Sequence, residues 1–485
     1  MRAFRIPRSG FLRAAPLAAA LALAGCALNQ PPEPQALRAD ALPSVKVPEA
    51  WSSGGGAAGA VRDDWIATFA DAQLASLVSE ALASNLDLRV AAARVERAAA
   101  YAKQAGSTLY PQVNLLASGS FTGSDSGSAF ETAGLFVSWE LDLWGRVRAQ
   151  AEAGSAQYEA AAKDAEYARQ SIAALVAKSW FLAVEARRQR AIAQEMLAAA
   201  EKLAALARER ARIGRGDEYD VRLAQASLQG YRDTVLQLQL SEQQAIRAIE
   251  TLVGRYPAAA LDTAAQFPAF PGPVPAGLPS ELLERRLDVA AAERRVASAY
   301  YLVGEAEAAR LPRISLTGSG SSITSDLVFL KDRENPAWSA GGNLVMPLFM
   351  GGALKAQVEV RTAEQKAAVA DYGRIGARAF SEVENALSAG FNLAARVPVL
   401  EGSVAENERA LELAQVRYKV GSADQRAVQQ QLLAAAAARA ALTRAQGERL
   451  VQRVNLHLAL GGGFGPPAVA TAAGPAAANP APTPH

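Results

Sequence analysis

The sequence predicts an internally duplicated α+β membrane protein, and three patterns lead to that prediction. Two long stretches match each other, each contains two strand-like segments of alternating polarity, and each ends in an unusually long helix-like segment. With 485 residues, of which 50% are hydrophobic and 20% charged, the chain can bury a large core. Much of the apolar fraction is alanine, which suits closely packed long helices.

The duplication consists of two series of matching residues. The run from Leu86 to Pro111 recurs from Leu287 to Pro312, shifted by 201 residues. A later series, shifted by 207 residues, pairs Gly145, Arg210, Gly214, Val221 and Gly254 with Gly352, Arg417, Gly421, Val428 and Gly461. Because chance does not hold an offset over such a distance, we predict two structural repeats. The six extra residues of the second copy fall in a loop between its proline and its first glycine.

Each repeat contains a predicted β-hairpin that starts at its matching proline, Pro111 or Pro312. In the first copy the apolar positions alternate with polar ones and include Val113, Leu115, Ala117, Leu135, Val137, Trp139 and Leu141. The second copy repeats the alternation with Ile314, Leu316, Trp338, Ala340 and Leu344. Strands with one apolar face and aromatic residues near their ends are typical of a transmembrane β-barrel wall, although a soluble hairpin packed on a helix is the alternative. Since the smallest barrels have about eight strands, four strands per chain require several chains.

A helical hairpin follows each β-hairpin. The segment from Gly145 to Ile213 has no proline and predicts a helix roughly 100 Å long. Its lower half has heptad spacing, interrupted at Arg210, through Ile192, Met196, Ala199, Leu203, Leu206 and Ile213. The return segment continues the spacing, interrupted at Glu242, with Val221, Ala224, Leu228, Tyr231, Val235, Leu238, Ala245, Ile249 and Leu252. The hairpins turn at Gly214 and Gly421. We expect Pro398 to kink the descending helix of the second copy.

The amino terminus is typical of a bacterial lipoprotein precursor. Four arginines precede an Ala/Leu-rich segment that is too short to span a bilayer. The only cysteine ends the run Leu23-Ala24-Gly25-Cys26, which resembles a lipobox, so we expect Cys26 to carry a covalent lipid; the alternative is a cysteine lost with an ordinary signal peptide. Ala27, in place of Asp, implies sorting to the outer membrane. No other cofactor is expected.

These features divide the chain into six predicted segments. They are a signal peptide (1–25), a lipidated amino terminus with a Pro-rich tether (26–60), a first repeat (61–256), a surface linker (257–279), a second repeat (280–463) and a disordered tail (464–485). Within the repeats the β-hairpins are expected at 111–143 and 312–348, and the helical hairpins at 145–254 and 352–460.

Composition excludes several function classes. The formal net charge of +2 lacks the basic excess of a nucleic-acid-binding protein. One cysteine and two histidines are too few for most zinc or other transition-metal sites, and we expect no metal. His485 ends the sequence and His457 lies alone in an apolar stretch, where a structural role is expected. Because no pair of nucleophile and base can be assembled, we do not expect an enzyme.

From Trp51 to Gly463 the chain resembles the TolC-like outer-membrane efflux factors, in particular the lipid-anchored branch that serves resistance-nodulation-division pumps. The matching motifs are Trp65-x3-Phe69-x-Asp71-x2-Leu74, Asn85-Leu86-Asp87-Leu88, and the run from Gly277 to Val289 that contains Arg285-Arg286-x-Asp288. Leu287 stands where the family usually has proline, and Gly145, Gly351 and Gly352 resemble the glycines between strand and helix.

The resemblance implies a homotrimer. Its twelve strands, four from each chain, would close one barrel in the lipid of the outer membrane, continued by an antiparallel α-helical barrel in the periplasm. Such a protein is a passive conduit for drugs or other small molecules, and its partners would be a periplasmic adaptor and an inner-membrane resistance-nodulation-division pump. The alternatives are the conduit of a type I protein secretion system, which the lipobox disfavours, and a structural envelope lipoprotein.

The resemblance also implies a periplasmic entrance at the two helical turns. The candidate gate residues are Asp424, Asp217 and Asp220, whose carboxylates would form rings in a trimer, and Tyr418 and Arg417, which resemble groups that tie neighbouring hairpins together. An alternative is that the aspartates merely cap helices at a turn. The chain departs from the family where Gln429, Gln430 and Gln431 replace some of the expected aspartates, so the ring would be built differently.

Overall fold

The computed structural model describes residues 30–54, 61, 63–120, 130–324 and 336–462. The predicted signal peptide, Cys26, the turn of the first β-hairpin and the predicted tail lie outside these residues. The chain divides into two compact units. Unit 1 comprises Met1–Val47, Asp87–Ala168 and Leu283–Phe380, and unit 2 comprises Pro48–Leu86, Arg169–Leu282 and Ser381–His485.

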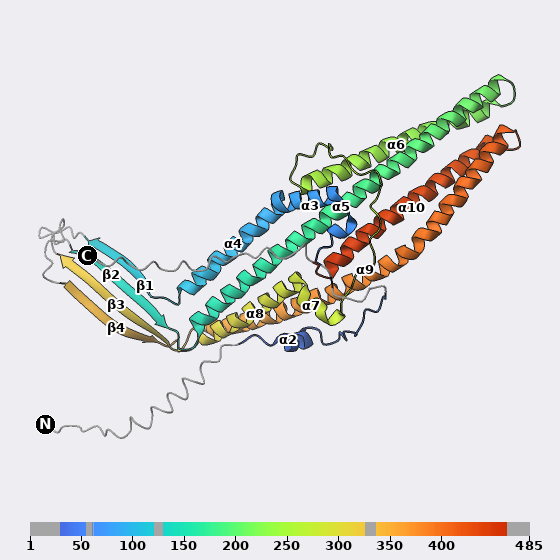
Figure 1. Cartoon of the computed structure of the whole chain (residues 1–485). Helices are drawn as coiled ribbons and strands as arrows, with labels where there is room; N and C mark the ends of the chain where they lie inside the picture. The colour runs from blue at the N-terminus through green and yellow to red at the C-terminus, as the bar shows by residue number, and fades with distance from the viewer. Residues whose placement is uncertain (1–29, 55–60, 62, 121–129, 325–335, 463–485) are drawn as a thin grey trace, which may run out of the picture. The chain divides into compact units, whose positions relative to one another are not determined.

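Unit 1 contains a four-stranded antiparallel sheet in the order β1-β2-β3-β4 (Figure 1). The strands are β1 (Gln112–Ser120), β2 (Phe130–Leu141), β3 (Arg313–Thr324) and β4 (Pro336–Val345). Each repeat contributes one hairpin, and β2 pairs with β3 to join the two hairpins into one sheet. The predicted strand segments are therefore confirmed.

The pairing register places most of the apolar residues of the four strands on one face. Val113 lies opposite Val137, Trp139 opposite Leu316, and Ile314 opposite Leu344. Directly paired residues share a face, so these positions form one apolar surface, and the intervening polar residues lie on the other face. Many of these apolar side chains are exposed in the single chain, including Val113, Leu115, Leu135, Leu316, Trp338 and Leu344.

In the described parts of the two units, helix α2 (Pro34–Ala41) is followed along the chain by ten further helices, two of them 3₁₀. They are η1 (Ala67–Phe69), α3 (Ala72–Ser84), α4 (Leu86–Ser107), α5 (Arg146–Arg212), α6 (Glu218–Leu252), η2 (Pro279–Glu281), α7 (Leu282–Arg285), α8 (Leu287–Ala308), α9 (Ala353–Lys419) and α10 (Gln425–Ala459). The equivalent long helices of the two repeats have equal lengths, 67 residues for α5 and α9 and 35 for α6 and α10. Helix α9 continues without interruption through Pro398. Within the described residues, no helix is both long and apolar enough to cross a membrane.

The segment predicted as a Pro-rich tether contains a short helix. Helix α2 (Pro34–Ala41) begins at a proline in the first helical turn, where the missing N–H is not needed. Its Leu37 is 2% exposed, and the Arg38 guanidinium pairs with Glu284 at 3.0 Å. The Ala41 carbonyl lies directly against Gly373 of α9, where no side chain fits.

We expect Gly373→Ala to displace α2 from α9, because the added Cβ would collide with the Ala41 carbonyl oxygen. The measurement is hydrogen exchange of the α2 amides, which should become faster. Gly402→Ala is the matched control, since it lies in the same helix with open space around it. Both changes raise helix propensity by about 1 kcal/mol, so equal exchange of α2 in the two variants would contradict the packing explanation.

In unit 2 the side chains buried on the lower part of α5 are mainly alanines. The predicted seam residues of α5 from Ile192 to Leu206 are half-buried, and Met196 and Ala199 pack against a core cluster. The fully buried positions are the adjacent alanines Ala193, Ala200, Ala204 and Ala207. The buried alanines keep the heptad spacing one residue further along, and small side chains let helices approach closely. On α6 the prediction is confirmed for Val221, Ala224, Leu228, Tyr231 and Ile249, which are buried. The other predicted positions, Val235, Leu238, Ala245 and Leu252, are half-buried.

The main core of unit 2 lies around two tryptophans. Trp65 and Trp180 are both fully buried, together with Phe69 and Phe181. The proline-rich linker lies on the surface of this unit, with most of its residues exposed or half-buried. The buried Glu250 carboxylate accepts backbone N–H bonds from residues 259–261 at 2.7 to 3.1 Å, and these bonds fix the start of the linker.

His457 has the structural position that the sequence predicted. Its imidazole is 2% exposed and stacks on the Trp65 indole, with ring centroids 5.5 Å apart. Neither ring nitrogen has a hydrogen-bond partner among the described residues. Burial, together with the nearby Arg453 charge, lowers the pKa of His457 to about 3.

This burial predicts acid sensitivity. Below about pH 6.5 the unfolded chain binds a proton at this histidine that the folded chain does not, so stability falls by up to roughly 1.4 kcal/mol per pH unit between 6.5 and 3. We expect His457→Phe, which keeps an aromatic ring against Trp65, to remove this part of the pH dependence. The free energy of unfolding of the wild-type and His457→Phe proteins, measured at pH 7 and 5.5, tests this. An equal change with pH in the two proteins would contradict the assignment of the acid sensitivity to His457.

Candidate functional site

The predicted gate residues lie at the turns of the two helical hairpins in unit 2. The α5–α6 turn closes with the Arg215 N–H donating to the Arg210 carbonyl at 2.8 Å. Gly214 has φ +70°, a conformation that glycine adopts without strain. Asp217 then caps α6, because its carboxylate accepts the Asp220 N–H at 2.8 Å. The turn thus pairs a carbonyl at the end of α5 and an N–H group at the start of α6, which have no partner within their own helices.

The α9–α10 turn repeats this geometry. The Ser422 N–H donates to the Arg417 carbonyl at 2.9 Å, and Gly421 has φ +85°. Asp424 caps α10 by accepting the Ala427 N–H at 2.9 Å. Asp217 and Asp424 therefore make the capping contacts that were the alternative to a gate role, and each keeps an exposed carboxylate beyond the cap. A capping contact uses one oxygen and does not prevent a second function.

Arg210 joins the first hairpin to Tyr418 of the second. The Arg210 guanidinium donates to the Tyr418 carbonyl at 2.6 Å and lies over the Tyr418 ring, 4.5 Å from its centroid. Tyr418 is 2% exposed, and its hydroxyl donates to the fully buried Gln425 amide oxygen at 3.1 Å. A planar cation that donates to a carbonyl and stacks on an aromatic face makes a specific contact between helices.

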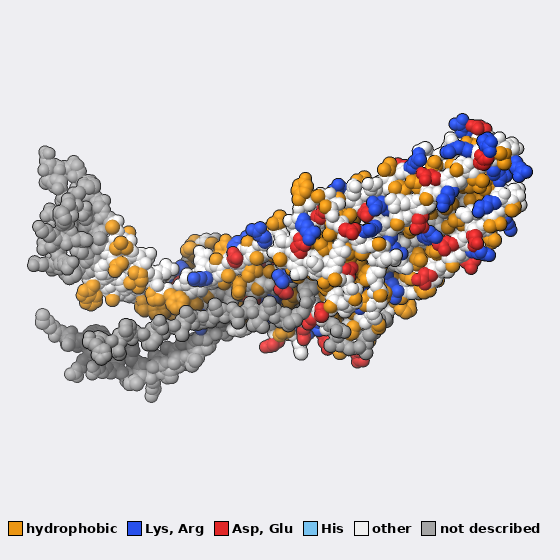
Figure 2. Space-filling view, turned by 45° about the horizontal axis from the view of Figure 1, so that its top comes forward, with side chains coloured by type: hydrophobic (Ala, Val, Ile, Leu, Met, Phe, Trp, Pro, Cys, Tyr) orange, Lys and Arg blue, Asp and Glu red, His pale blue; other side chains and the backbone are white. Residues whose placement is uncertain are grey.

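Acidic and basic side chains gather around this contact, and Figure 2 shows them crowded over the helical turns. Burial, followed by the like charges of Asp217 and Asp424, raises the pKa of Asp220, while Arg210 and Arg426 oppose the increase. The Arg426 guanidinium also donates to the Tyr219 hydroxyl at 2.8 Å. The three predicted aspartates thus share one electrostatic environment. We call this group the tip cluster: Arg210, Asp217, Tyr219, Asp220, Tyr418, Asp424, Gln425 and Arg426.

Arg417 does not take part in the tip cluster. Its side chain is exposed and has no hydrogen-bond or ion-pair partner among the described residues of the chain. Within this chain the contact between the hairpins at Tyr418 is made by Arg210, the equivalent arginine of the first repeat, and the tie through Arg417 stays a prediction. In the sequence, Arg210 stands out only as an interruption of the heptad seam. Its match to Arg417 in the second repeat is the signal that could have identified it as a residue of the turns.

Residues 77–255 and 278–462 both match the family described as outer membrane efflux protein, one match for each repeat. The chain belongs to this family. It is 30% identical to the cation efflux system protein CusC of Escherichia coli O6:H1 over 93% of this chain and 98% of that one. It is 32% identical to the outer membrane protein OprJ of Pseudomonas aeruginosa over 78% and 82% of the two chains.

A solved structure supports the same conclusion. The Campylobacter jejuni CmeC outer membrane channel has a TM-score of 0.81 to this chain at 25% identity, and the likeness covers 87% of this chain and 95% of that one. The protein is therefore an outer-membrane channel component of an efflux system, which confirms the family, fold class and location predicted from the sequence.

Proposed function

We propose that three copies of the chain form a passive conduit for small molecules across the outer membrane. A twelve-stranded barrel, with four strands from each chain, would insert in the lipid, and the helices would enclose a periplasmic tunnel. A periplasmic adaptor and an inner-membrane resistance-nodulation-division pump would complete the tripartite system and supply the energy. The apolar face of the sheet is the observation that carries the proposal.

That face needs a covering that the described residues of the chain do not provide. Leu115 is 73% exposed, Leu344 64% and Trp338 80%, on strands whose other face is mostly polar. In the sheet order, β1 and β4 each have one unpaired edge among the described strands. Unpaired edges and exposed apolar residues are costly in a single sheet, and both disappear when several sheets close into a barrel surrounded by lipid.

The repeats supply an independent argument for further copies. In unit 1, α8 packs against α5 of the preceding repeat, where Ser298 donates to the Ala153 carbonyl at 3.0 Å and Arg295 pairs with Asp164. The equivalent residues of α4, Arg97 and Arg94, are exposed instead. Helix α4 has no preceding repeat in its own chain, so a neighbouring chain would supply the missing helix, its α9.

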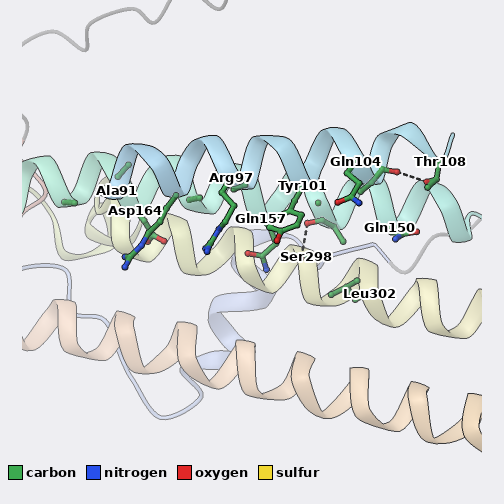
Figure 3. Close-up of a pocket in the computed structure, with 18 residues that line it drawn as sticks. Ala91, Arg97, Tyr101, Gln104, Thr108, Gln150, Gln157, Asp164, Ser298 and Leu302 are labelled. Atoms are coloured by element: carbon green, nitrogen blue, oxygen red, sulfur yellow. Dashed lines mark hydrogen bonds between the residues drawn. The ribbon is translucent and has the colours of Figure 1, made fainter. Parts of the chain in front are cut away.

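Figure 3 shows side chains of α4 that line a pocket beside α5 and α8. Arg97, Tyr101 and Gln104 line a pocket of about 850 Å³ together with residues of α5 and α8. Helix α4 itself has no buried residue over its 22 residues, although it is long enough to carry a packed face. A helix left this exposed in one chain is the element that an assembly would cover.

The tip cluster is the proposed entrance of the tunnel. Threefold symmetry would turn Asp217, Asp220 and Asp424 into rings of carboxylates that repel one another and attract cations. The tie between Arg210 and Tyr418 would hold the hairpins of each chain in the closed arrangement. The name of CusC refers to cations and others in the family to different cargo, so the tunnel is proposed for small molecules without a narrower class.

Single-channel recording in planar bilayers tests the conduit. We expect the purified full-length protein to insert and give discrete, long-lived current steps whose size does not depend on an energy source. A correctly folded protein that inserts but gives no current would contradict a passive conduit. The type I secretion alternative is separated by drug susceptibility, which should rise on deletion of the gene while protein secretion is unchanged.

Cys26 is proposed to carry the lipid anchor. We expect Cys26→Ser to abolish acylation and to reduce the amount assembled in the outer membrane, with some insertion remaining because the sheet itself is apolar on one face. Mass spectrometry of the mature amino terminus measures this. An unmodified residue 26 in the wild-type protein, or cleavage beyond it, would contradict the proposal.

A further inference from the structure

Unit 2 contains a second polar feature, distant in sequence from the turns, where the linker crosses α10. Arg449 and Arg453 lie one helical turn apart on α10, and both face Phe270 of the linker. The Arg449 guanidinium is 3.6 Å from the Phe270 ring centroid and that of Arg453 is 5.5 Å away. Arg453 also donates to the carbonyls of Pro271 and Gly272.

The two charges are not compensated. Neither Arg449 nor Arg453 has an ion-pair partner among the described residues, and the Nε of each is buried without a hydrogen-bond acceptor. Arg453 is only 7% exposed. Burial, and then the charge of Arg449, lowers the pKa of Arg453 to about 10. Buried charges in proteins are normally paired, so two neighbouring arginines without a carboxylate are unusual.

The arginines form one wall of a pocket of about 520 Å³ between the linker, α9 and α10. The remaining wall is mostly apolar and includes Val274, Leu387, Phe391 and Leu456. No aspartate or glutamate is among the described residues that line it. Phe391 is 67% exposed at the rim, although it is a large apolar side chain. A concave apolar site with a few convergent charged groups is the usual form of a small-ligand site.

We propose that this pocket binds a small amphipathic anion, an organic acid whose carboxylate pairs with Arg449 and Arg453 and whose apolar body contacts Phe391 and Leu456. Guanidinium groups bind carboxylates with charge-assisted hydrogen bonds, and an anion would compensate both charges at once. The pocket volume admits one small aromatic or acyl chain rather than a folded segment. The proposal does not depend on the conduit function.

The test uses full-length protein in nanodiscs and equilibrium dialysis with 2-naphthoate. We expect one molecule bound per chain, with 2-naphthamide, its neutral counterpart, at least tenfold weaker because it lacks the charge. The same dialysis experiment compares decanoate with decanol, its neutral counterpart. Tighter binding of decanoate than of 2-naphthoate would show that the anion bound at this site is an acyl chain from lipid. Equal binding of 2-naphthoate and its amide, and of decanoate and decanol, would overturn the proposal without any variant.

The variants locate the site. Arg449→Gln should weaken 2-naphthoate binding about tenfold, and Arg449→Lys should retain part of the affinity. Arg396→Gln is the matched control, because Arg396 is an exposed arginine of α9 outside the pocket. Unchanged binding in Arg449→Gln protein with a wild-type thermal transition would contradict the site. Inorganic phosphate alone, if it bound as tightly as 2-naphthoate, would contradict the amphipathic class.

Discussion

Replacing Asp71 with alanine is expected to lower the free energy of unfolding of unit 2 by roughly 2–5 kcal/mol, the sum of a lost helix cap and a buried donor left unpaired. The Asp71 carboxylate accepts the backbone N–H groups of Gln73 at 3.0 Å and Leu74 at 2.9 Å, which caps α3. Its second oxygen accepts the indole N–H of the fully buried Trp180 at 2.8 Å. One carboxylate thus fixes α3 against α5.

The cap and the buried bond can be separated. Asp217→Ala is the matched control, because Asp217 caps α6 at an exposed turn with no buried donor, and it should cost only about 1 kcal/mol. Trp180→Phe combined with Asp71→Ala should cost less than the sum of the single changes. Denaturant unfolding gives the free energy of unfolding of the Asp71→Ala, Asp217→Ala, Trp180→Phe and doubly substituted proteins relative to the wild type. An Asp71→Ala loss no larger than that of Asp217→Ala would show that the Trp180 bond contributes nothing.

Arg210→Ala is expected to open the tunnel entrance. The substitution removes the hydrogen bond to the Tyr418 carbonyl and the stacking on its ring. Contacts of this kind contribute about 1–3 kcal/mol each, so three of them in a trimer amount to several kcal/mol, enough to convert a mostly closed population into a mostly open one. Single-channel conductance should rise, and block by cations added from the tip side should weaken as the aspartates separate.

Arg417→Ala is the matched control for the entrance, because Arg417 occupies the equivalent turn position with an exposed side chain. It should leave conductance unchanged. Asp424→Ala with Tyr418→Ala should act like Arg210→Ala, since it removes a carboxylate ring and the aromatic side of the tie. Wild-type conductance in correctly assembled Arg210→Ala channels would mean that the contact merely packs the turns, and a larger effect of Arg417→Ala would reassign the tie to contacts between chains.

Much of the fold follows from periodicities that the sequence displays directly. The constant offset between the repeats predicted equal helical hairpins, because equivalent residues in duplicated segments occupy equivalent places. The strands were predictable because a shift of one residue would move every apolar side chain, such as Val113 and Leu135, to the polar face. The turns at Gly214 and Gly421 were predictable because each needs a positive φ.

The features that the sequence did not predict depend on contacts between distant segments. The buried seam of α5 runs through alanines because close approach of the helices selects small residues, whereas hydrophobicity alone favours Met196 and its larger neighbours. Glu242 interrupts the seam of α6 because it pairs with Arg190 at 2.9 Å. Arg210 could be assigned to Tyr418 only once the two turns were seen together, since 208 residues separate them along the chain.

The number of chains and strands in the detergent-solubilised particle, determined by electron cryo-microscopy, tests the central proposal most directly. We expect three chains around one axis and a closed ring of twelve strands, in which β1 of each chain pairs with β4 of the next and α9 of a neighbour covers the exposed side of α4. A particle of one or two chains, with the β1 and β4 edges unpaired and the apolar face of the sheet turned toward protein, would contradict it.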